Sequence, residues 1–486
     1  MKKFVLRAPI LSFTVIILIL QFSNGCKKFL DVNENPNNPV NASPELLLPT
    51  VEAAIGQIIG NNFQVYGNFW AQYWTQSPSA SQYRSIDQYR VANTAFDRSW
   101  INLYRGALQN AQLIINNQTA GNKEIKGMAY ILKAYSFQLA TDAFGDIPLT
   151  EALQGNQISS PHYQRQQVVY DSIFNYLDTG IALLRAPGSI SPGTQDILFN
   201  SDIDQWIRFA RTLKLRCYLR LSQVEPNIAA SGIAALYTSG GGFLETDASI
   251  NYSSTGGNEN PFYNESVGLG RTQNAVASEN IVAAMLRNAD PRLQKFYQPL
   301  PNADTVAYIA QGSYSGNSNK EVSPPSALVG GNANSPASAT APVKLISATE
   351  SYFLQAEAVA RGWATGNLVE LFNNGIRASF ESLSIITLAQ AYIDSAQDAV
   401  LPGNVEGNVR AIVTQKYYAL TGFQGFEAWT EWRRTGYPDF IHASAASTLG
   451  SGRLPLRFLY PNSEITTNQN FPGNQLIYTP VWWDVN

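Results

Sequence analysis

Cysteine and histidine are scarce in this chain of 486 residues, which contains two of each. Cys26 follows an apolar amino-terminal stretch and is expected to carry a lipid, which leaves Cys217 without a partner for an intramolecular disulfide. Cys217 is instead expected to be a small buried apolar side chain. His162 and His442 have no second histidine at helical spacing, so neither a histidine metal site nor a catalytic base is predicted.

Charged residues are also few: they make up 14% of the chain, and the formal net charge is −3. No run of more than two basic residues occurs, so the clusters that neutralise phosphates are missing and nucleic acid is not an expected partner. Aromatic residues are abundant, with 23 Phe, 24 Tyr and 9 Trp. This richness fits a large helical core and equally fits an extracellular site for polar organic ligands.

The amino terminus has the features of an export signal. An apolar stretch from Ile10 to Leu20, shorter than the roughly 20 residues that cross a bilayer, follows the basic residues Lys2, Lys3 and Arg7. A small residue, Gly25, then precedes Cys26, which is the arrangement that lipoprotein signal peptidase recognises. We therefore expect residues 1–25 to be a lipoprotein signal peptide and Cys26 to carry the acyl chains that anchor the protein.

The cleavage site departs from the usual pattern, because Ser23 replaces the common Leu and Asn24 is also atypical. An ordinary secretory signal with an incidental cysteine therefore stays an alternative. Residues 26–43 are rich in Asn and Pro, which favour extended or turn backbone, and are expected to form the lipid anchor and a tether. No linker interrupts residues 44–486, which are expected to form a single domain.

Helical periodicity dominates from Pro44 onward and strand-like alternation is scarce, which predicts a mainly α fold. Paired helices joined by short turns are similar to tetratricopeptide units, although no clean period is present. Between Pro299 and Pro342 the chain is rich in Gly, Ser, Asn and Ala, and long loops are expected there. The predicted helices are Pro44–Ile59, Phe63–Gln76, Phe96–Asn117, Lys123–Phe144, Gln167–Leu184, Ile203–Gln223, Asn280–Arg287, Leu345–Trp363, Leu368–Phe380 and Val405–Thr421.

Short motifs follow one another along the whole chain. They include CKKFLD at 26–31, LLLP at 46–49, AFGDIPL at 143–149, QAEA at 355–358, EAW at 427–429 and WRRTGYP at 432–438. As an ordered set they resemble the SusD/RagB family of nutrient-binding outer-membrane lipoproteins, in particular its SusD-like branch with shorter motifs.

The resemblance implies tetratricopeptide-like helical pairs packed against a loop-rich subdomain. It implies a binding protein, not an enzyme, that captures an oligosaccharide or peptide nutrient. Such a protein is held in the outer membrane by its lipid anchor, faces the exterior, and acts as the lid of a TonB-dependent barrel of the SusC type. No catalytic residue, metal ligand or cofactor is predicted.

Sugars present apolar faces rimmed by hydroxyl groups, so their sites combine aromatic rings with amide and charged side chains. The stretch from Tyr66 to Tyr89 has this mixture, and its first aromatic residues share one helical face. Such a stripe usually packs in a core, so residues in the following loop are better candidates. The candidate ligand contacts are Trp70, Trp74, Tyr83, Arg84, Tyr89, Asn258, Tyr263 and Asn264.

The carboxyl-terminal motifs are expected to be structural. Trp429 and Trp432 are predicted core aromatics, Arg433 and Arg434 are predicted to form intramolecular ion pairs, and Glu357 is predicted to be a paired carboxylate. A glycoside hydrolase is the main alternative function, because it needs only two carboxylates and the chain has 36 acidic residues. A structural or adhesive surface protein is the third possibility, since the fold does not fix the function.

Overall fold

The computed structural model describes residues 43–118, 121–187, 191–301 and 303–486, and residues 44–486 form one compact unit. The predicted signal peptide, Cys26 and all but the last residue of the tether lie outside the described residues. The division of the chain into signal peptide, tether and single domain therefore stays a prediction.

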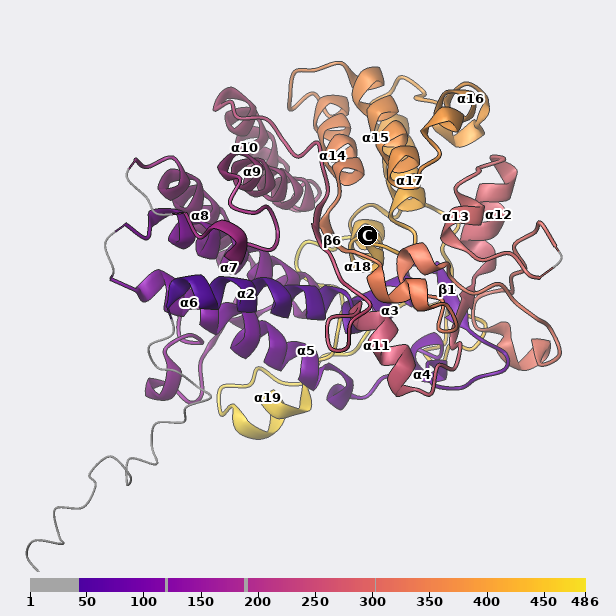
Figure 1. Cartoon of the computed structure of the whole chain (residues 1–486), viewed down its shortest axis with the longest axis horizontal. Helices are drawn as coiled ribbons and strands as arrows, with labels where there is room; N and C mark the ends of the chain where they lie inside the picture. The colour runs from indigo at the N-terminus through magenta and orange to yellow at the C-terminus, as the bar shows by residue number, and fades with distance from the viewer. Residues whose placement is uncertain (1–42, 119–120, 188–190, 302) are drawn as a thin grey trace, which may run out of the picture. The chain divides into compact units, whose positions relative to one another are not determined.

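Helices make up most of the described secondary structure, which confirms the mainly α class (Figure 1). They are α2 Pro44–Ile59, α3 Asn62–Trp70, α4 Arg84–Asp87, α5 Asp97–Ile101, α6 Gln109–Asn116, α7 Lys123–Phe144, α8 Gln166–Leu184, α9 Ile203–Arg220, α10 Pro226–Thr238, α11 Pro261–Gly268, α12 Glu279–Arg287, α13 Leu293–Phe296, α14 Ala348–Ala360, α15 Leu368–Ser382, α16 Ala389–Ser395, α17 Val405–Leu420, α18 Gly425–Thr435 and α19 Asn462–Thr467. The strands form short antiparallel pairs: β1 Trp74–Gln76 with β5 Ala275–Ala277, β2 Ile147–Pro148 with β3 Tyr163–Gln164, and β4 Ala248–Ile250 with β6 Val343–Ile346.

The predicted helix boundaries hold where local signals are strong. Helix α7 ends at Gly145, whose φ of +83° is a backbone conformation that glycine adopts without a Cβ penalty. The predicted helix over 63–76 is wrong in its second half. It ends at Trp70, and residues 74–76 form β1 because they pair with a strand about 200 residues further along the chain.

Consecutive long helices pack in pairs, as in tetratricopeptide units: α7 with α8, α9 with α10, and α14 with α15 (Figure 1). A glycine permits close approach in each pair. A Cβ on Gly180 would lie 2.7 Å from a side-chain carbon of Ile131, on Gly232 2.2 Å from the Tyr218 ring, and on Gly375 2.7 Å from the Phe353 ring. A larger residue at these positions would force the paired helices apart.

A network of buried ion pairs joins α7, α9, α14, α17 and α18. Its shorter contacts include Arg216 to Glu350 at 2.7 Å, Arg220 to Glu427 at 2.8 Å, and Arg434 to Glu357 at 2.7 Å. The predicted pairing of Arg434 and Glu357 is confirmed. Because each charged group of this network has a partner of opposite charge, their attraction offsets the cost of removing these groups from water.

Arg433 differs from its neighbour, since it makes no ion pair with a described residue. Its guanidinium group lies 3.7 Å from the centre of the Trp429 ring and donates to the carbonyl oxygens of Asp142 and Leu456. The predicted ion pair is therefore wrong for Arg433, because carbonyl groups and a ring face take the place of a carboxylate. Trp429 is fully buried as predicted, whereas Trp432 is half-buried. Cys217 is free and buried, which confirms its prediction.

None of the helices among the described residues is long and apolar enough to span a bilayer.

Candidate ligand-binding cleft

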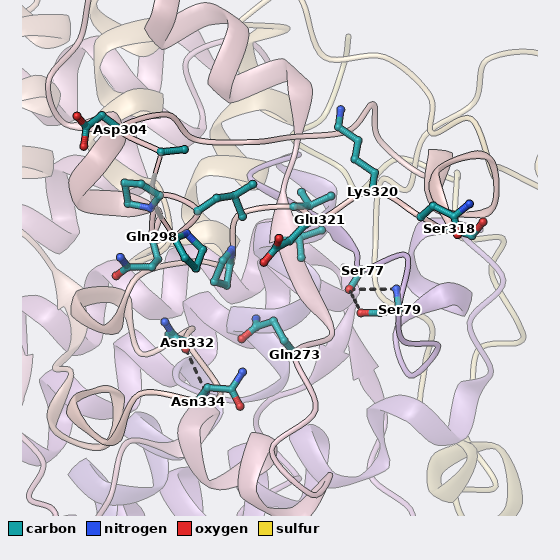
Figure 2. Close-up of a pocket in the computed structure, with 18 residues that line it drawn as sticks. Ser77, Ser79, Gln273, Gln298, Asp304, Ser318, Lys320, Glu321, Asn332 and Asn334 are labelled. Atoms are coloured by element: carbon teal, nitrogen blue, oxygen red, sulfur yellow. Dashed lines mark hydrogen bonds between the residues drawn. The ribbon is translucent and has the colours of Figure 1, made fainter.

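A polar cleft of about 890 Å³ opens among loops around the β1–β5 pair and after α13 (Figure 2). One part of its wall is apolar and consists of Val276, Pro299, Leu300, Pro301, Ala303, Val322 and Pro324. The rest carries hydroxyl, amide and charged groups from Ser77, Ser79, Gln273, Gln298, Asp304, Ser318, Asn319, Lys320, Glu321, Asn332 and Asn334. Its volume is that of a site for a ligand of several rings.

Hydrogen bonds fix one side of the cleft. Gln273 donates to the carbonyl oxygens of Ala275, at 2.6 Å, and Gly331, at 3.1 Å, and its own oxygen accepts from the amide of Ala333 at 2.9 Å. The hydroxyl groups of Ser77 and Ser79 lie 2.9 Å apart. Gln273 therefore ties β5 to the loop around residue 331, and the wall is largely preformed.

A buried carboxylate, Asp87, stabilises the strand β1 next to this wall. Asp87 accepts hydrogen bonds from the Thr75 hydroxyl at 2.8 Å, the Gln76 amide at 2.7 Å and the Gln311 side chain at 2.5 Å. Burial raises the pKa of Asp87 to about 6, and these three donors act in the opposite direction. Asp87 therefore links β1 to Gln311, which precedes the cleft residues 318–322 in the chain.

Other polar groups of the cleft have no partner. The side chains of Gln298, Asp304, Glu321 and Asn334 make no hydrogen bond or ion pair with another described residue, and all four are exposed. Lys320, by contrast, is held by the carbonyl oxygen of Tyr308 at 2.7 Å. Two amides and two carboxylates are thus free to bind hydroxyl groups of a ligand, beside prolines and aliphatic side chains that suit apolar sugar faces.

The structure places the predicted aromatic contacts elsewhere. Trp70 and Trp74 are almost fully buried, at 1% and 0% exposure. The Trp70 ring packs edge-on against Trp429 at 4.9 Å between centroids, and Trp74 stacks on Phe262 at 5.1 Å. The expectation that this aromatic stripe packs in the core is confirmed, and neither ring offers a free face in this structure.

The loop residues after this stripe differ from one another. Tyr83 and Tyr89 are buried, with 6% and 3% exposure, so neither ring offers a free face in this structure, and their predicted ligand contacts stay predictions. The hydroxyl of Tyr89 accepts a hydrogen bond from the Ser444 amide at 3.0 Å, which helps to hold this side chain in its buried position. Arg84 is exposed, and its guanidinium lies 5.2 Å from the ring centre of Tyr314. Its predicted ligand contact stays a prediction.

The second predicted region, residues 258–264, lies at the start of α11. Asn258 and Asn264 are exposed, and their amides donate to Ser253 and to the carbonyl oxygen of Glu259. Tyr263 is buried at 7% exposure, and the ligand contacts predicted for these three residues stay predictions. None of the eight predicted contacts lines the cleft.

The cleft residues escaped sequence reasoning because they are single polar residues from separated loops. The only signal was the Gly-, Ser- and Asn-rich composition between Pro299 and Pro342, which predicted long loops. That stretch contributes most of the lining, with residues between Pro299 and Asn334, so the composition indicated the region but not the individual side chains.

The two carboxylates of the cleft lack the surroundings of a glycosidase acid. Asp304 and Glu321 are exposed side chains, whereas the acid of a glycoside hydrolase lies in surroundings that shield it from water. Within the described part of the chain, no three His, Cys, Asp or Glu side chains come together as a metal site.

Comparison with known proteins identifies the family. Residues 36–461 match the model of a SusD-like family described as starch-binding associating with outer membrane. The chain belongs to this SusD-like family. No curated protein matches the chain.

Solved structures support the fold. A chitin-binding SusD homologue from Flavobacterium johnsoniae aligns with a TM-score of 0.73 at 24% identity, covering 91% of this chain and 98% of that one. A SusD/RagB family protein from Bacteroides thetaiotaomicron aligns with a TM-score of 0.76 at 23% identity, covering 92% and 99%. The likeness confirms a SusD-like fold over almost the whole of both chains.

Proposed function

We propose that this protein is a surface lipoprotein that binds an oligosaccharide in the cleft bounded by Gln298, Glu321 and Asn334. The family match over residues 36–461 carries the proposal, since that family is described as starch-binding and associated with the outer membrane. A chitin-binding protein among the similar structures, with a TM-score of 0.76 at 24% identity, supports a carbohydrate ligand.

The lining of the cleft supports the same class of ligand. Amide and carboxylate groups that have no partner among the described residues can accept and donate hydrogen bonds to several sugar hydroxyls at once. Apolar residues such as Leu300 and Pro324 can cover a C–H face of the ring. Because no aromatic ring lines the cleft among the described residues, we expect weak affinity, on the order of micromolar to millimolar.

Calorimetric titration with malto- and chito-oligosaccharides tests the proposal. Removing the free groups with Gln298→Ala and Asn334→Ala should each weaken binding by about tenfold, at an unchanged melting temperature. Gln195→Ala is the matched control, because it removes an exposed amide that lies outside the cleft and is not a candidate ligand contact. Equal weakening by the control, or no binding of any oligosaccharide by the unaltered protein, would contradict the proposal. Intact oligosaccharides after prolonged incubation are expected, and hydrolysis would favour the glycosidase alternative.

The anchor and the transporter complete the proposal. A lipid on Cys26 would confine the protein to the membrane surface and raise its effective concentration beside a TonB-dependent barrel of the SusC type. It would then act as the lid over that barrel, facing the cell exterior. The Cys26→Ala variant should be lost from the outer-membrane fraction, and retention there would exclude the lipid anchor. Co-purification of the barrel with the lipidated protein is expected, and its absence would contradict the lid role.

A further inference from the structure

A second cavity, separate from the cleft, is lined by residues of α6, α7 and α8 and of the loop 149–157. Its volume is about 440 Å³, which is enough for a molecule the size of one or two sugar rings. Its wall carries the amides of Gln109, Gln112 and Asn116 from one face of α6, together with residues of the loop 149–157. The Tyr176 ring from α8 and the aliphatic side chains of Leu149 and Leu153 complete it.

Lys133 on α7 is the one charged residue among those that line this cavity. It is buried at 7% exposure, and its ammonium lies 4.3 Å from the centre of the Tyr176 ring. One N–H donates to the Gln112 side-chain oxygen at 2.7 Å. The amide of Gln112 donates in turn to Asn116 at 2.7 Å, which orients its oxygen toward the lysine.

The other buried lysines of the described residues are neutralised. Lys344 lies 2.7 Å from Asp247, and Lys416 lies 3.3 Å from Glu431. Lys133 has no carboxylate within ion-pair distance among the described residues, and no Asp or Glu lines its cavity. A buried ammonium group with two N–H groups unused by the described residues is energetically costly, and an anion in the cavity would remove that cost.

The burial of Lys133 also changes its acidity. Desolvation lowers the pKa of its ammonium to about 8, so the group still carries its charge at neutral pH but is poorly compensated. A negative charge beside it would stabilise the protonated form, and the same interaction would hold the anion in place.

We propose that this cavity binds a small carboxylate-bearing molecule, whose carboxylate pairs with the Lys133 ammonium while its polar body meets the amides of α6 and the Tyr176 ring. A single positive charge matches a monoanion. An acidic sugar and the carboxyl terminus of a short peptide both offer this chemistry. The site is independent of the cleft, since the two share no lining residue.

Calorimetric titration of the purified protein with two matched pairs of ligands tests this inference. D-glucuronate is compared with D-glucuronamide, and N-acetyl-dialanine is compared with its carboxyl-terminal amide. At least one acid should bind at least about tenfold more tightly than its neutral amide, and the pair that shows the difference identifies the source of the carboxylate. Equal affinity of acid and amide in both pairs, or no binding by either acid, would overturn the proposal.

Three variants test whether binding of the acid depends on Lys133. Lys133→Met keeps the length of the side chain and should abolish the preference for the acid. Gln112→Glu supplies an internal carboxylate at the position of the present 2.7 Å contact, so it should also block the acid while raising the melting temperature. Lys123→Met is the control, because it removes an exposed lysine of the same helix. An unchanged preference in Lys133→Met or Gln112→Glu, or its loss in Lys123→Met, would overturn the assignment.

Discussion

Replacing Arg434 by Met tests whether the buried ion-pair network stabilises the fold. Arg434 is completely buried and makes contacts of 2.7 Å with each of two carboxylates, Glu357 and Glu431. Methionine keeps most of the apolar volume but leaves Glu357 with Arg361 alone, at 2.8 Å. Removing one partner of a buried pair costs about 3–5 kcal/mol, because the remaining charges are poorly compensated.

The matched control is Arg410→Met. Arg410 makes an equally short contact of 2.6 Å with Asp439, but both side chains are more than half exposed. Exposed pairs contribute about 0–1 kcal/mol, so this variant should unfold almost like the unaltered protein. Guanidinium unfolding followed by tryptophan fluorescence gives both free energies. A difference between the two variants of less than about 1 kcal/mol would refute the reasoning, since burial would then add nothing to the pair.

Three further predictions concern pH and the aromatic core. Burial alone would raise the pKa of Glu357, but Arg434 and Arg361 hold it below its ordinary value of 4.5, and Glu431 shows the same pattern. The stabilisation from these two carboxylates is therefore present above pH 4.5 and is lost as the pH falls through their lowered pKa values. The loss of unfolding free energy caused by Arg434→Met should shrink in acid, and a loss that does not change with pH would contradict this. Trp429→Ala should lower the free energy of unfolding by about 3–5 kcal/mol by opening a large cavity, and a loss below about 1 kcal/mol would be inconsistent with its burial. Tyr89→Phe removes the acceptor of the Ser444 amide and should cost about 1–3 kcal/mol without changing oligosaccharide affinity, as thermal melts and calorimetry can check.

The fold was predictable where one short segment contains its own signals. Pro44 starts α2 and Gly145 ends α7, and both helices have the predicted bounds. Residues 74–76 could not be assigned locally, because their strand exists only through pairing with Ala275–Ala277. Tertiary contacts override helical spacing at such a place.

The candidate site was much less predictable than the fold. Aromatic residues such as Trp70 were natural candidates, yet they form the core because a ring at helical spacing gains most from burial. Gln298, Glu321 and Asn334 carry no sequence pattern, and only the folding of distant loops brings them to one cleft. Lys133 has the sequence surroundings of an ordinary helix residue, and only the three-dimensional structure reveals that none of the described residues places a carboxylate beside it.

A crystal structure of the protein soaked with a malto- or chito-oligosaccharide tests the central proposal most directly. The account predicts sugar density in the cleft of about 890 Å³, with ring hydroxyls within hydrogen-bond distance of Gln298, Glu321 or Asn334. Sugar bound elsewhere, for example on the surface around Arg84 and Asn258, with the cleft empty at the same concentration, would contradict it.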